Sequence, residues 1–239
     1  MTKFAIVITT YKRKDGNTLK KITKAINSIK KQKHTDWKVF LIGDRYEDEE
    51  EFLEIEKLLP KNKVKAVNRP TAEERDTYLE GSFRLWCSGG NASSRAGIEL
   101  AIEEGFEFIC YLDHDDFWHP MHLKFFDDAI KKHNDVVVLA SKAHYLQENN
   151  LIPRDTTLSG YGYIPQPENV IKSSTCLRWP RLKVRARNVY KETGIEKPGD
   201  LDLWERLSEE MIIEGKKGYL VPFATCYHVE EHAVLRGLG

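Results

Sequence analysis

The sequence predicts an α/β protein built on a mostly parallel sheet with helices on both faces. Two observations lead to this prediction. Over residues 1–118, apolar runs rich in β-branched residues alternate with segments whose apolar residues recur every three or four positions. These are the patterns of buried strands and of amphipathic helices. No internal repeat or low-complexity linker interrupts the 239 residues, so we expect one domain spanning 1–239.

The first half of the chain gives the clearest elements. Residues 4–10 (FAIVITT) and 38–44 (KVFLIGD) have the continuous apolar character of strands covered on both faces. Isoleucines at three- and four-residue steps predict an amphipathic helix at 18–32 between them. The pattern then predicts a short helix at 52–59, a weaker strand at 64–67, a helix from Asn91, a strand at 107–113 and a helix from Pro120.

The second half is less regular. Two paired strands are predicted at 135–141 and 143–153, and a helix at 182–193 that stops at Gly194. The stretch 199–215 predicts a helix opened by acids, and 218–229 a closing strand that Pro222 would place at a sheet edge. The glycine- and tyrosine-rich segment 159–167 fits either a lid or a static surface loop.

Composition narrows the class of function. Lys plus Arg and Asp plus Glu both total 37, so no global positive field would attract nucleic acid or anionic lipid. The four cysteines are far apart, which argues against a zinc knuckle or a disulfide scaffold and fits a reducing, cytoplasmic compartment. No apolar run is long enough to span a bilayer, and the N-terminal run is too short for a signal peptide.

The most informative stretch is LDHDDFWHP, where a buried strand breaks into acid at Asp113, Asp115 and Asp116. Carboxylates this close repel one another unless a partner or a cation separates them. Oxygen ligands of this kind suit Mg²⁺ or Mn²⁺ together with phosphate. Alternatively, Asp115 or Asp116 would simply cap the following helix. Tyr11 and Asp44 also follow predicted strands, so polar groups from three strands should meet at one edge of the sheet.

Taken in order, five motifs resemble the inverting family 2 glycosyltransferases of the GT-A fold, over roughly residues 4–235. They are TTYKR after the first strand, the Asp ending the second, GGNASSRAGIE, LDHDDFWHP and GDLDLWERL. The resemblance implies a nucleotide-sugar-binding half at 1–118 and a smaller acceptor-side half at 119–239. It also implies Mn²⁺ or Mg²⁺ as cofactor, a UDP- or GDP-type sugar donor, and a glycan or other hydroxyl acceptor.

The resemblance also assigns roles to individual residues. Thr9 and Tyr11 would shape the nucleotide pocket, with the Tyr11 ring against the base. Asp44 would accept hydrogen bonds from the base, Asp113 would face the ribose, and Arg95 would lie near the ribose or phosphates.

For the chemistry, Asp115 would bind the metal, with His228 as a second candidate ligand from the closing segment. Asp200 would be the general base that takes the proton of the acceptor hydroxyl. Gly199 stands where relatives often carry an acid, so Asp202 is the alternative base.

Three other functions remain open from the residues alone. A phosphohydrolase would use the first Asp as nucleophile, although Asp116 and Phe117 do not fit its usual motif. A sugar-nucleotide nucleotidyltransferase would need a glycine-rich basic loop after the first strand, which TTYKRKDG matches only loosely. A catalytically silent nucleotide-sugar-binding module would keep the metal and the donor without turnover.

Overall fold

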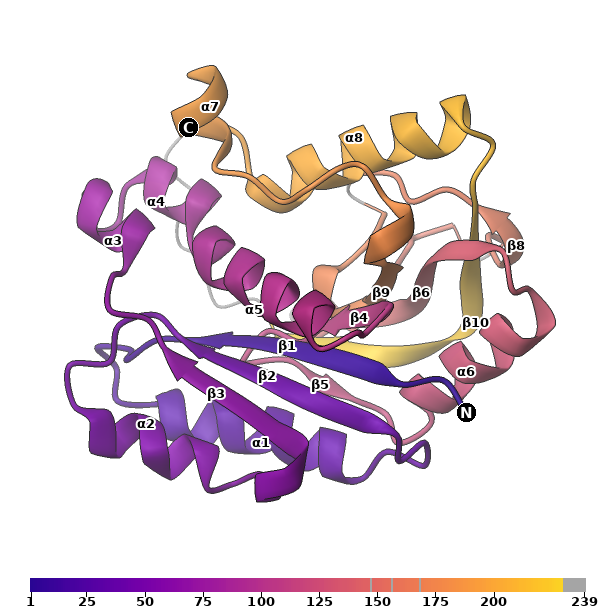
Figure 1. Ribbon diagram of the computed structural model, residues 1–239. Coiled ribbons are helices and arrows are strands. Elements are labelled where there is room, and N and C mark those ends of the chain that lie inside the picture. Colours follow the sequence, from indigo (N-terminus) through magenta and orange to yellow (C-terminus); the bar gives the residue numbers. More distant parts are fainter. Residues whose placement is uncertain (147, 156, 168, 230–239) are drawn as a thin grey trace.

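The computed structural model describes residues 1–146, 148–155, 157–167 and 169–229. Within these ranges ten strands form one sheet in the spatial order β3-β2-β1-β4-β9-β6-β10-β5, with β7 beside β6 and β8 beside β10 (Figure 1). The strands are β1 (Phe4–Thr10), β2 (Trp37–Gly43), β3 (Val64–Asn68), β4 (Phe108–Tyr111), β5 (Phe117–Trp118), β6 (Val136–Tyr145), β7 (Asn150–Ile152), β8 (Gly160–Tyr163), β9 (Thr175–Arg178) and β10 (Lys217–His228).

The sheet is mostly parallel in its main body, as predicted. β3, β2, β1 and β4 pair in parallel, β9 then runs antiparallel to both β4 and β6, and β10 runs parallel to β6. The sheet therefore continues from the first half of the chain into the second. The carboxyl ends of β2, β1 and β4 lie next to one another at one edge.

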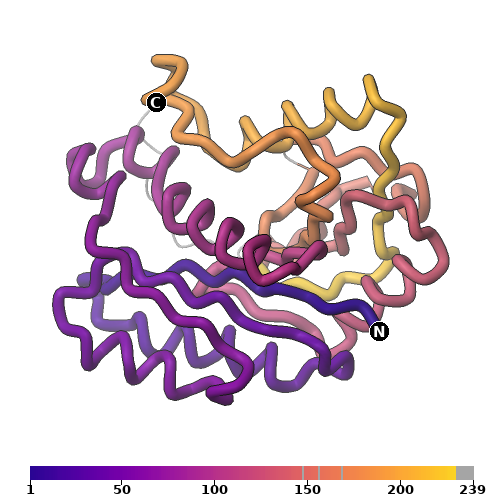
Figure 2. Tube along the Cα trace, in the orientation of Figure 1, coloured from indigo at the N-terminus to yellow at the C-terminus, as the bar shows by residue number. Residues whose placement is uncertain are grey.

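Helices cover both faces of this sheet. They are α1 (Thr18–Lys30), α2 (Glu49–Glu56), α3 (Glu73–Thr77), α4 (Phe83–Ser88), α5 (Asn91–Glu103), α6 (His122–Lys132), α7 (Val189–Thr193) and α8 (Gly199–Ile213). Figure 1 shows α1 and α2 on one side of β1–β3, and α5 and α8 on the other. In Figure 2 the orange and yellow second half of the chain passes on the same side as α5. No helix in the described ranges is both long and apolar enough to cross a membrane.

Two hydrophobic cores explain why β1 is apolar at successive positions. Because side chains alternate along a strand, Phe4, Ile6 and Ile8 join the core under α1, α2 and α6. Ala5 and Val7 join the core under α5 and α8. Each isoleucine that is fully buried in this way contributes roughly 1.5–3 kcal/mol. This two-sided burial is what the sequence pattern predicted.

Helix α5 lies unusually close to the sheet at Gly97. A Cβ atom placed on Gly97 would lie 2.6 Å from Cγ1 of Val7 and 3.1 Å from Cγ1 of Ile42. Real side chains do not approach that closely, so glycine is needed here for space rather than for backbone freedom. The close approach fixes the height of α5 above β1 and β2.

Part of the second half differs from the sequence prediction. The sequence predicts two strands at 135–141 and 143–153, but the chain forms one long strand, β6, across most of the first range and the start of the second. The end of β6 then pairs with the short β7, with Ala143 opposite Ile152. The predicted edge strand β10 lies inside the sheet, between β6 and the strands β5 and β8. Pro222 is tolerated because the register with β6 shifts between Val221 and Ala224, at an irregularity where no ladder bond is required.

Two further segments also differ. Of the predicted helix at 182–193, only Val189–Thr193 is helical, with Gly194 left-handed at its end as expected. The Glu210 carboxylate accepts the backbone N–H groups of Lys183 and Val184, which satisfies them outside a helix. The candidate lid at 159–167 contains β8, which pairs with the amino-terminal part of β10, away from the edge where β2, β1 and β4 end.

The close approach at Gly97 gives a prediction for stability. Gly97→Ala should lower the free energy of unfolding by roughly 1–3 kcal/mol because the new methyl must displace Val7 or lift α5. This corresponds to a melting temperature lower by about 2–4 °C for each kcal/mol in a chain of this size. Thermal unfolding by circular dichroism measures it. Glu99→Ala, on the exposed face of the same helix, is the control. Equal melting temperatures for wild type and Gly97→Ala would show that the packing has room to spare.

Candidate active site

Three polar residues from three neighbouring strands meet at the edge of the sheet. Tyr11 follows β1, Asp44 follows β2, and Asp113 stands two residues beyond the end of β4. The backbone N–H of Asp44 donates to the carbonyl of Thr10 at 2.8 Å, so the parallel pairing extends to this point. Tyr11 packs edge-on against His114, with ring centroids 5.5 Å apart. The convergence that the strand pattern predicted is present.

Asp44 is buried and held from several sides. Its Oδ2 accepts from Nε of Arg75 at 2.8 Å, and its Oδ1 accepts from the Ser93 hydroxyl at 3.1 Å. Arg69 lies 3.7 Å from Oδ1. The Arg75 guanidinium also lies 5.5 Å from the centre of the Tyr11 ring. Sequence reasoning missed Arg69, Arg75 and Ser93, because each lies between 25 and 49 positions from Asp44 along the chain.

The start of α5 lies beside the end of β1. Gly90, in a left-handed conformation with φ 76°, turns the chain into α5, and a Cβ there would lie 3.7 Å from the Thr9 hydroxyl. The buried carboxylate of Glu74 accepts the backbone N–H of Ala92 at 2.7 Å. Arg95, one turn into α5, forms an ion pair with Glu73 at 3.7 Å. Thr9 and the start of α5 therefore lie next to each other at this edge of the sheet, whereas the Arg95 side chain points toward α3.

The acidic motif forms a tight turn. The backbone N–H of Asp116 donates to the carbonyl of Asp113 at 3.0 Å. Lys172 lies 3.5 Å from Asp113 Oδ1, and the backbone N–H of Asp113 donates to the Ser173 hydroxyl at 3.0 Å. Burial would raise the pKa of Asp113, but the charge of Lys172, assisted by nearby histidines, lowers it overall. Asp113 is thus kept ionised by a cation from the second half of the chain.

Asp116 is fully buried and joins this turn to the end of β10. Both of its oxygens lie 3.0 Å from Nδ1 of His228, and Oδ1 accepts the backbone N–H of Val229 at 2.9 Å. Burial acts to lower the pKa of His228, but the hydrogen bond to Asp116 and its charge raise it overall. Asp116 does not cap the following helix, which was the alternative from the sequence. It anchors β10 instead.

Asp115, unlike Asp116, has no hydrogen-bonding partner on another residue in the described ranges that would stabilise its charge. It lies close enough to Asp113 and Asp116 to feel their charges. Burial first, and then the charges of Asp116 and Asp113, raise the pKa of Asp115 to about 7. A carboxylate that is costly to ionise in the protein alone fits a position where a cation binds. Because Asp116 occupies Nδ1 of His228, only Nε2 of that ring is left for a metal.

The structure itself holds no group of three or more His, Cys, Asp or Glu residues in the described part of the chain that would suffice to bind a metal ion. Asp115 and His228 supply at most two protein ligands. Such a site fits an ion that completes its shell with water and with a phosphate-bearing ligand, as Mg²⁺ and Mn²⁺ commonly do.

The two candidate bases at the start of α8 differ sharply. Asp202 is buried and accepts two hydrogen bonds from Arg187, at 3.0 and 2.8 Å, and one from Arg206 at 2.8 Å. Burial would raise the pKa of Asp202, but the two guanidinium groups lower it overall. Asp200 is exposed, and among the residues that the structure describes its carboxylate accepts one hydrogen bond, from the next backbone N–H, that of Leu201, at 2.8 Å.

The position of Asp200 follows from the packing of Gly199. A Cβ on Gly199 would lie 2.2 Å from Nδ2 of Asn91, the first residue of α5. The start of α8 is therefore pressed against the start of α5, whose preceding residue Gly90 faces Thr9. A residue about 190 positions from Thr9 along the sequence is brought to the same edge of the sheet.

No protein-family model matches the chain. The uncharacterized glycosyltransferase R139 of Acanthamoeba polyphaga mimivirus is 32% identical to it over 241 residues, which cover 97% of this chain and 96% of the relative. The chain belongs to the glycosyltransferases. As expected from the resemblance, it does so over nearly its whole length.

Solved structures agree with this glycosyltransferase in fold. S. aureus TarS 1–349 in complex with UDP-GlcNAc matches with a TM-score of 0.66 at 16% identity, over 96% of this chain and 59% of that one. The mannosyltransferase PcManGT from Pyrobaculum calidifontis, in complex with GDP-Man and Mn²⁺, matches with a TM-score of 0.56 at 13% identity, over 97% and 58%. Both are glycosyltransferases of the GT-A fold. This chain spans about six tenths of their length.

The contrast between Asp200 and Asp202 predicts different effects on the stability of the glycosyltransferase. Asp202→Asn should lower the free energy of unfolding by roughly 1–3 kcal/mol, because it leaves two partly buried guanidinium groups without their carboxylate. Asp200→Asn should change it by less than about 0.5 kcal/mol, because the side chain is exposed. Urea titrations of both variants measure this. If Asp200→Asn is the more destabilising variant, the carboxylate that holds the start of α8 has been misassigned.

The raised pKa of Asp115 predicts a pH dependence. Its folded value of about 7 lies above the ordinary 3.8, so the native state loses stability as pH rises from about 4 through about 7. Asp115→Asn removes this cost and should therefore stabilise the metal-free protein at pH 8 by roughly 1–3 kcal/mol. At pH 4.5, less than one unit above the ordinary 3.8, the gain should be clearly smaller, and it should vanish only below about pH 4. Thermal melts in EDTA at both pH values test this.

Asp116→Asn is the matched control for the neighbouring acid. It should destabilise the protein at pH 8, since it removes the charge that faces His228. A gain for Asp115→Asn that is equal at both pH values would show that the ionisation of Asp115 is not its source.

Proposed function

We propose that this glycosyltransferase transfers a sugar with inversion from a nucleoside-diphosphate sugar to an acceptor hydroxyl, with a divalent metal and with Asp200 as general base. The observation that carries the proposal is the different state of the two acids at the start of α8. Asp202 is hydrogen-bonded to two arginines, whereas the Asp200 carboxylate is exposed and follows Gly199, which packs on the first residue of α5.

The nucleotide fits the pocket formed after β1 and β2. Thr9 and the left-handed Gly90 lie together, with Tyr11 beyond them, where its ring would pack on the base. A carboxylate offers about four lone-pair positions, so Asp44 can still accept from a base N–H besides Ser93 and Arg75. The donors of TarS and PcManGT in their complexes, UDP-GlcNAc and GDP-Man, support a UDP- or GDP-type donor.

We assign the ribose and the phosphates of the donor to Asp113 and Arg95. Asp113, held ionised by Lys172, would accept from the ribose hydroxyls. Arg95 would leave its exposed ion pair with Glu73 to reach the ribose or phosphates, which costs little because such pairs are weak.

The metal would be held by Asp115, with Nε2 of His228 as the second candidate ligand. A cation fits this position because Asp115 is costly to ionise without one. The Mn²⁺ in the PcManGT complex supports Mn²⁺ as a candidate ion. When bound, such an ion would neutralise the charge that develops on the departing diphosphate. His228 is already fixed in orientation by Asp116, as a histidine near a metal usually is by a carboxylate.

Asp200 would act on the acceptor. Its carboxylate takes the proton of the acceptor hydroxyl while that oxygen forms a bond to the anomeric carbon. The bond between that carbon and the diphosphate oxygen breaks on the opposite face, and the electron pair leaves with the nucleoside diphosphate. The products are the inverted glycoside and the nucleoside diphosphate, so no covalent enzyme intermediate is needed.

One experiment separates this function from its alternatives. A thermal-shift screen of UDP, GDP and their sugars, with and without Mn²⁺, identifies the donor, because a ligand that binds the native state raises its melting temperature. Asp200→Asn should then keep the donor dissociation constant within about twofold while transfer falls about 10²–10⁴-fold. Asp115→Ala should lose the Mn²⁺-dependent shift.

Other outcomes would favour other functions. Full transfer by Asp200→Asn would exclude Asp200 as the base. Metal-dependent binding with no turnover of any sugar nucleotide would indicate a silent binding module. Synthesis of a sugar nucleotide from a nucleoside triphosphate would indicate a nucleotidyltransferase.

A further inference from the structure

Helix α4 carries an exposed aromatic pair. Phe83 and Trp86 are 53% and 40% exposed, and their rings stack with centroids 5.4 Å apart and planes 25° apart. We call these two residues the α4 platform. Leu79, which precedes α4 in the chain, and Ile195, which follows α7, are also exposed. Exposing an aromatic ring to water costs free energy, and exposed apolar groups that gather in one place commonly mark a binding surface.

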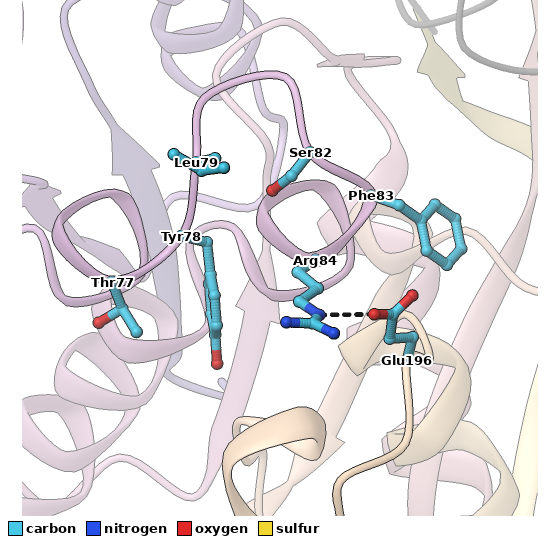
Figure 3. A pocket seen from close by; sticks show the side chains of 7 residues that line it. All are labelled: Thr77, Tyr78, Leu79, Ser82, Phe83, Arg84 and Glu196. Carbon is cyan, nitrogen blue, oxygen red and sulfur yellow. Dashed lines mark hydrogen bonds and ion pairs between the residues drawn. The ribbon is translucent and has the colours of Figure 1, made fainter.

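A cavity of about 300 Å³ lies beside the platform. Figure 3 shows the seven side chains that line it, which are Thr77, Tyr78, Leu79, Ser82, Phe83, Arg84 and Glu196. Arg84 crosses the cavity to Glu196, with Nε 2.5 Å from Oε1. The guanidinium also lies 4.2 Å from the centre of the Tyr190 ring, which holds it in place. The lining of the cavity thus combines aromatic rings, those of Tyr78 and Phe83, with the Arg84–Glu196 ion pair.

The platform lies close to the candidate base. Cys87 stands one turn after Phe83 in α4, and both Glu196 and Asp200 act on its thiol: burial raises the pKa of Cys87 to about 11, and these two charges add to the shift. Glu196 lines the cavity and stands four residues before Asp200. The contact of Gly199 with Asn91, just past the end of α4, joins the same two segments.

This combination of groups fits one kind of ligand best. A pyranose ring has a flat, C–H-rich face that packs on aromatic rings and an edge of hydroxyls that bond to planar polar side chains. The α4 platform can pack on the C–H-rich face, and Arg84 and Glu196 can form hydrogen bonds with the hydroxyls. A lipid chain would gain nothing from a charged pair at the cavity, which would have to be desolvated without a partner.

Building on the function proposed above, we propose that the α4 platform and its cavity form the acceptor subsite, and that the acceptor is a carbohydrate. The sugar unit next to the one that receives the transferred residue stacks on Phe83 and Trp86. Its hydroxyls bond to Arg84 and Glu196, and this places the reacting hydroxyl at Asp200.

Binding can be tested without any donor, because Trp86 is a selective reporter. The chain has five tryptophans, and the other four, Trp37, Trp118, Trp179 and Trp204, are at most 8% exposed. Iodide quenching of tryptophan fluorescence therefore reports mainly on Trp86. Chitotetraose, mannotetraose, cellotetraose and maltotetraose serve as probes. At least one should lower the quenching constant about twofold, as expected when a ring is covered.

Matched variants locate the effect. Phe83→Ala should abolish the protection, since the stacked surface is lost. Phe223→Ala is the control, because Phe223 is also exposed and stacked on a ring, that of Phe125, but lies on β10. It should keep the protection. Loss of protection in Phe223→Ala to the same degree would overturn the assignment to α4.

Kinetics then distinguish the subsite from a merely structural role. Trp86→Ala should raise the KM for the protecting saccharide as acceptor about tenfold, while the dissociation constant of the nucleoside diphosphate stays within about twofold. An equal loss of nucleotide affinity would overturn the subsite. So would protection of Trp86 by vesicles carrying a polyprenyl phosphate but by none of the saccharides.

The two proposals fail separately. If wild type turns over a donor but no saccharide protects Trp86, the carbohydrate subsite is refuted and the transferase function stands. If a saccharide protects Trp86 but no sugar nucleotide is turned over, the carbohydrate site is supported and the proposed transfer is refuted.

Discussion

The buried carboxylate of Asp116 holds the candidate site together. It belongs to the turn after β4, and its oxygens are taken by His228 and the backbone N–H of Val229, at the end of β10. A fully buried charge is tolerated only when it is paired and hydrogen-bonded, so this contact is nearly obligatory once the sheet has formed. It joins the two halves of the chain and fixes the turn that carries Asp113 and Asp115. The position of the proposed metal ligand therefore depends on an acid that takes no part in binding the metal.

The acids at this edge of the sheet divide into two groups by their partners. Asp44, Asp113 and Asp202 face arginine or lysine side chains, which stabilise their charge inside the protein. Asp115 and Asp200 have no such cation in the described ranges. Paired acids hold segments together, and because a cation already balances their charge, the lone pairs they have left suit a neutral donor such as a base N–H or a ribose hydroxyl. The two unpaired acids are those for which the proposed mechanism needs a free carboxylate, one toward a metal and one toward a hydroxyl.

Two glycines bring the start of α8 close to the edge of the sheet. Gly97 lets α5 lie directly on β1, and Gly199 lets α8 press against the first residue of α5. Neither glycine has a left-handed φ, so what matters at both is the missing side chain. Because α4 leads into α5, the same packing brings the α4 platform, the cavity and Asp200 into one region. The glycosyltransferase thus places its proposed base through helix packing, whereas its proposed metal ligand is placed by the sheet.

The sequence by itself determined the acidic turn, the helix α8, the family and, apart from the short helices α3 and α4, the order of strands and helices up to β4. Each of these is encoded in local periodicity or in a short motif, whereas the segment that holds α3 and α4 has no clear periodicity. The sequence could not distinguish Asp200 from Asp202, since both open the same helix with the same dipole. It also could not reveal that Asp116 binds His228, that Arg75 holds Asp44, that β10 lies inside the sheet, or that residues 182–188 are not helical. Only the tertiary structure decided these, because each rests on a partner about 26 to 113 residues away, whose approach depends on the packing of the whole sheet.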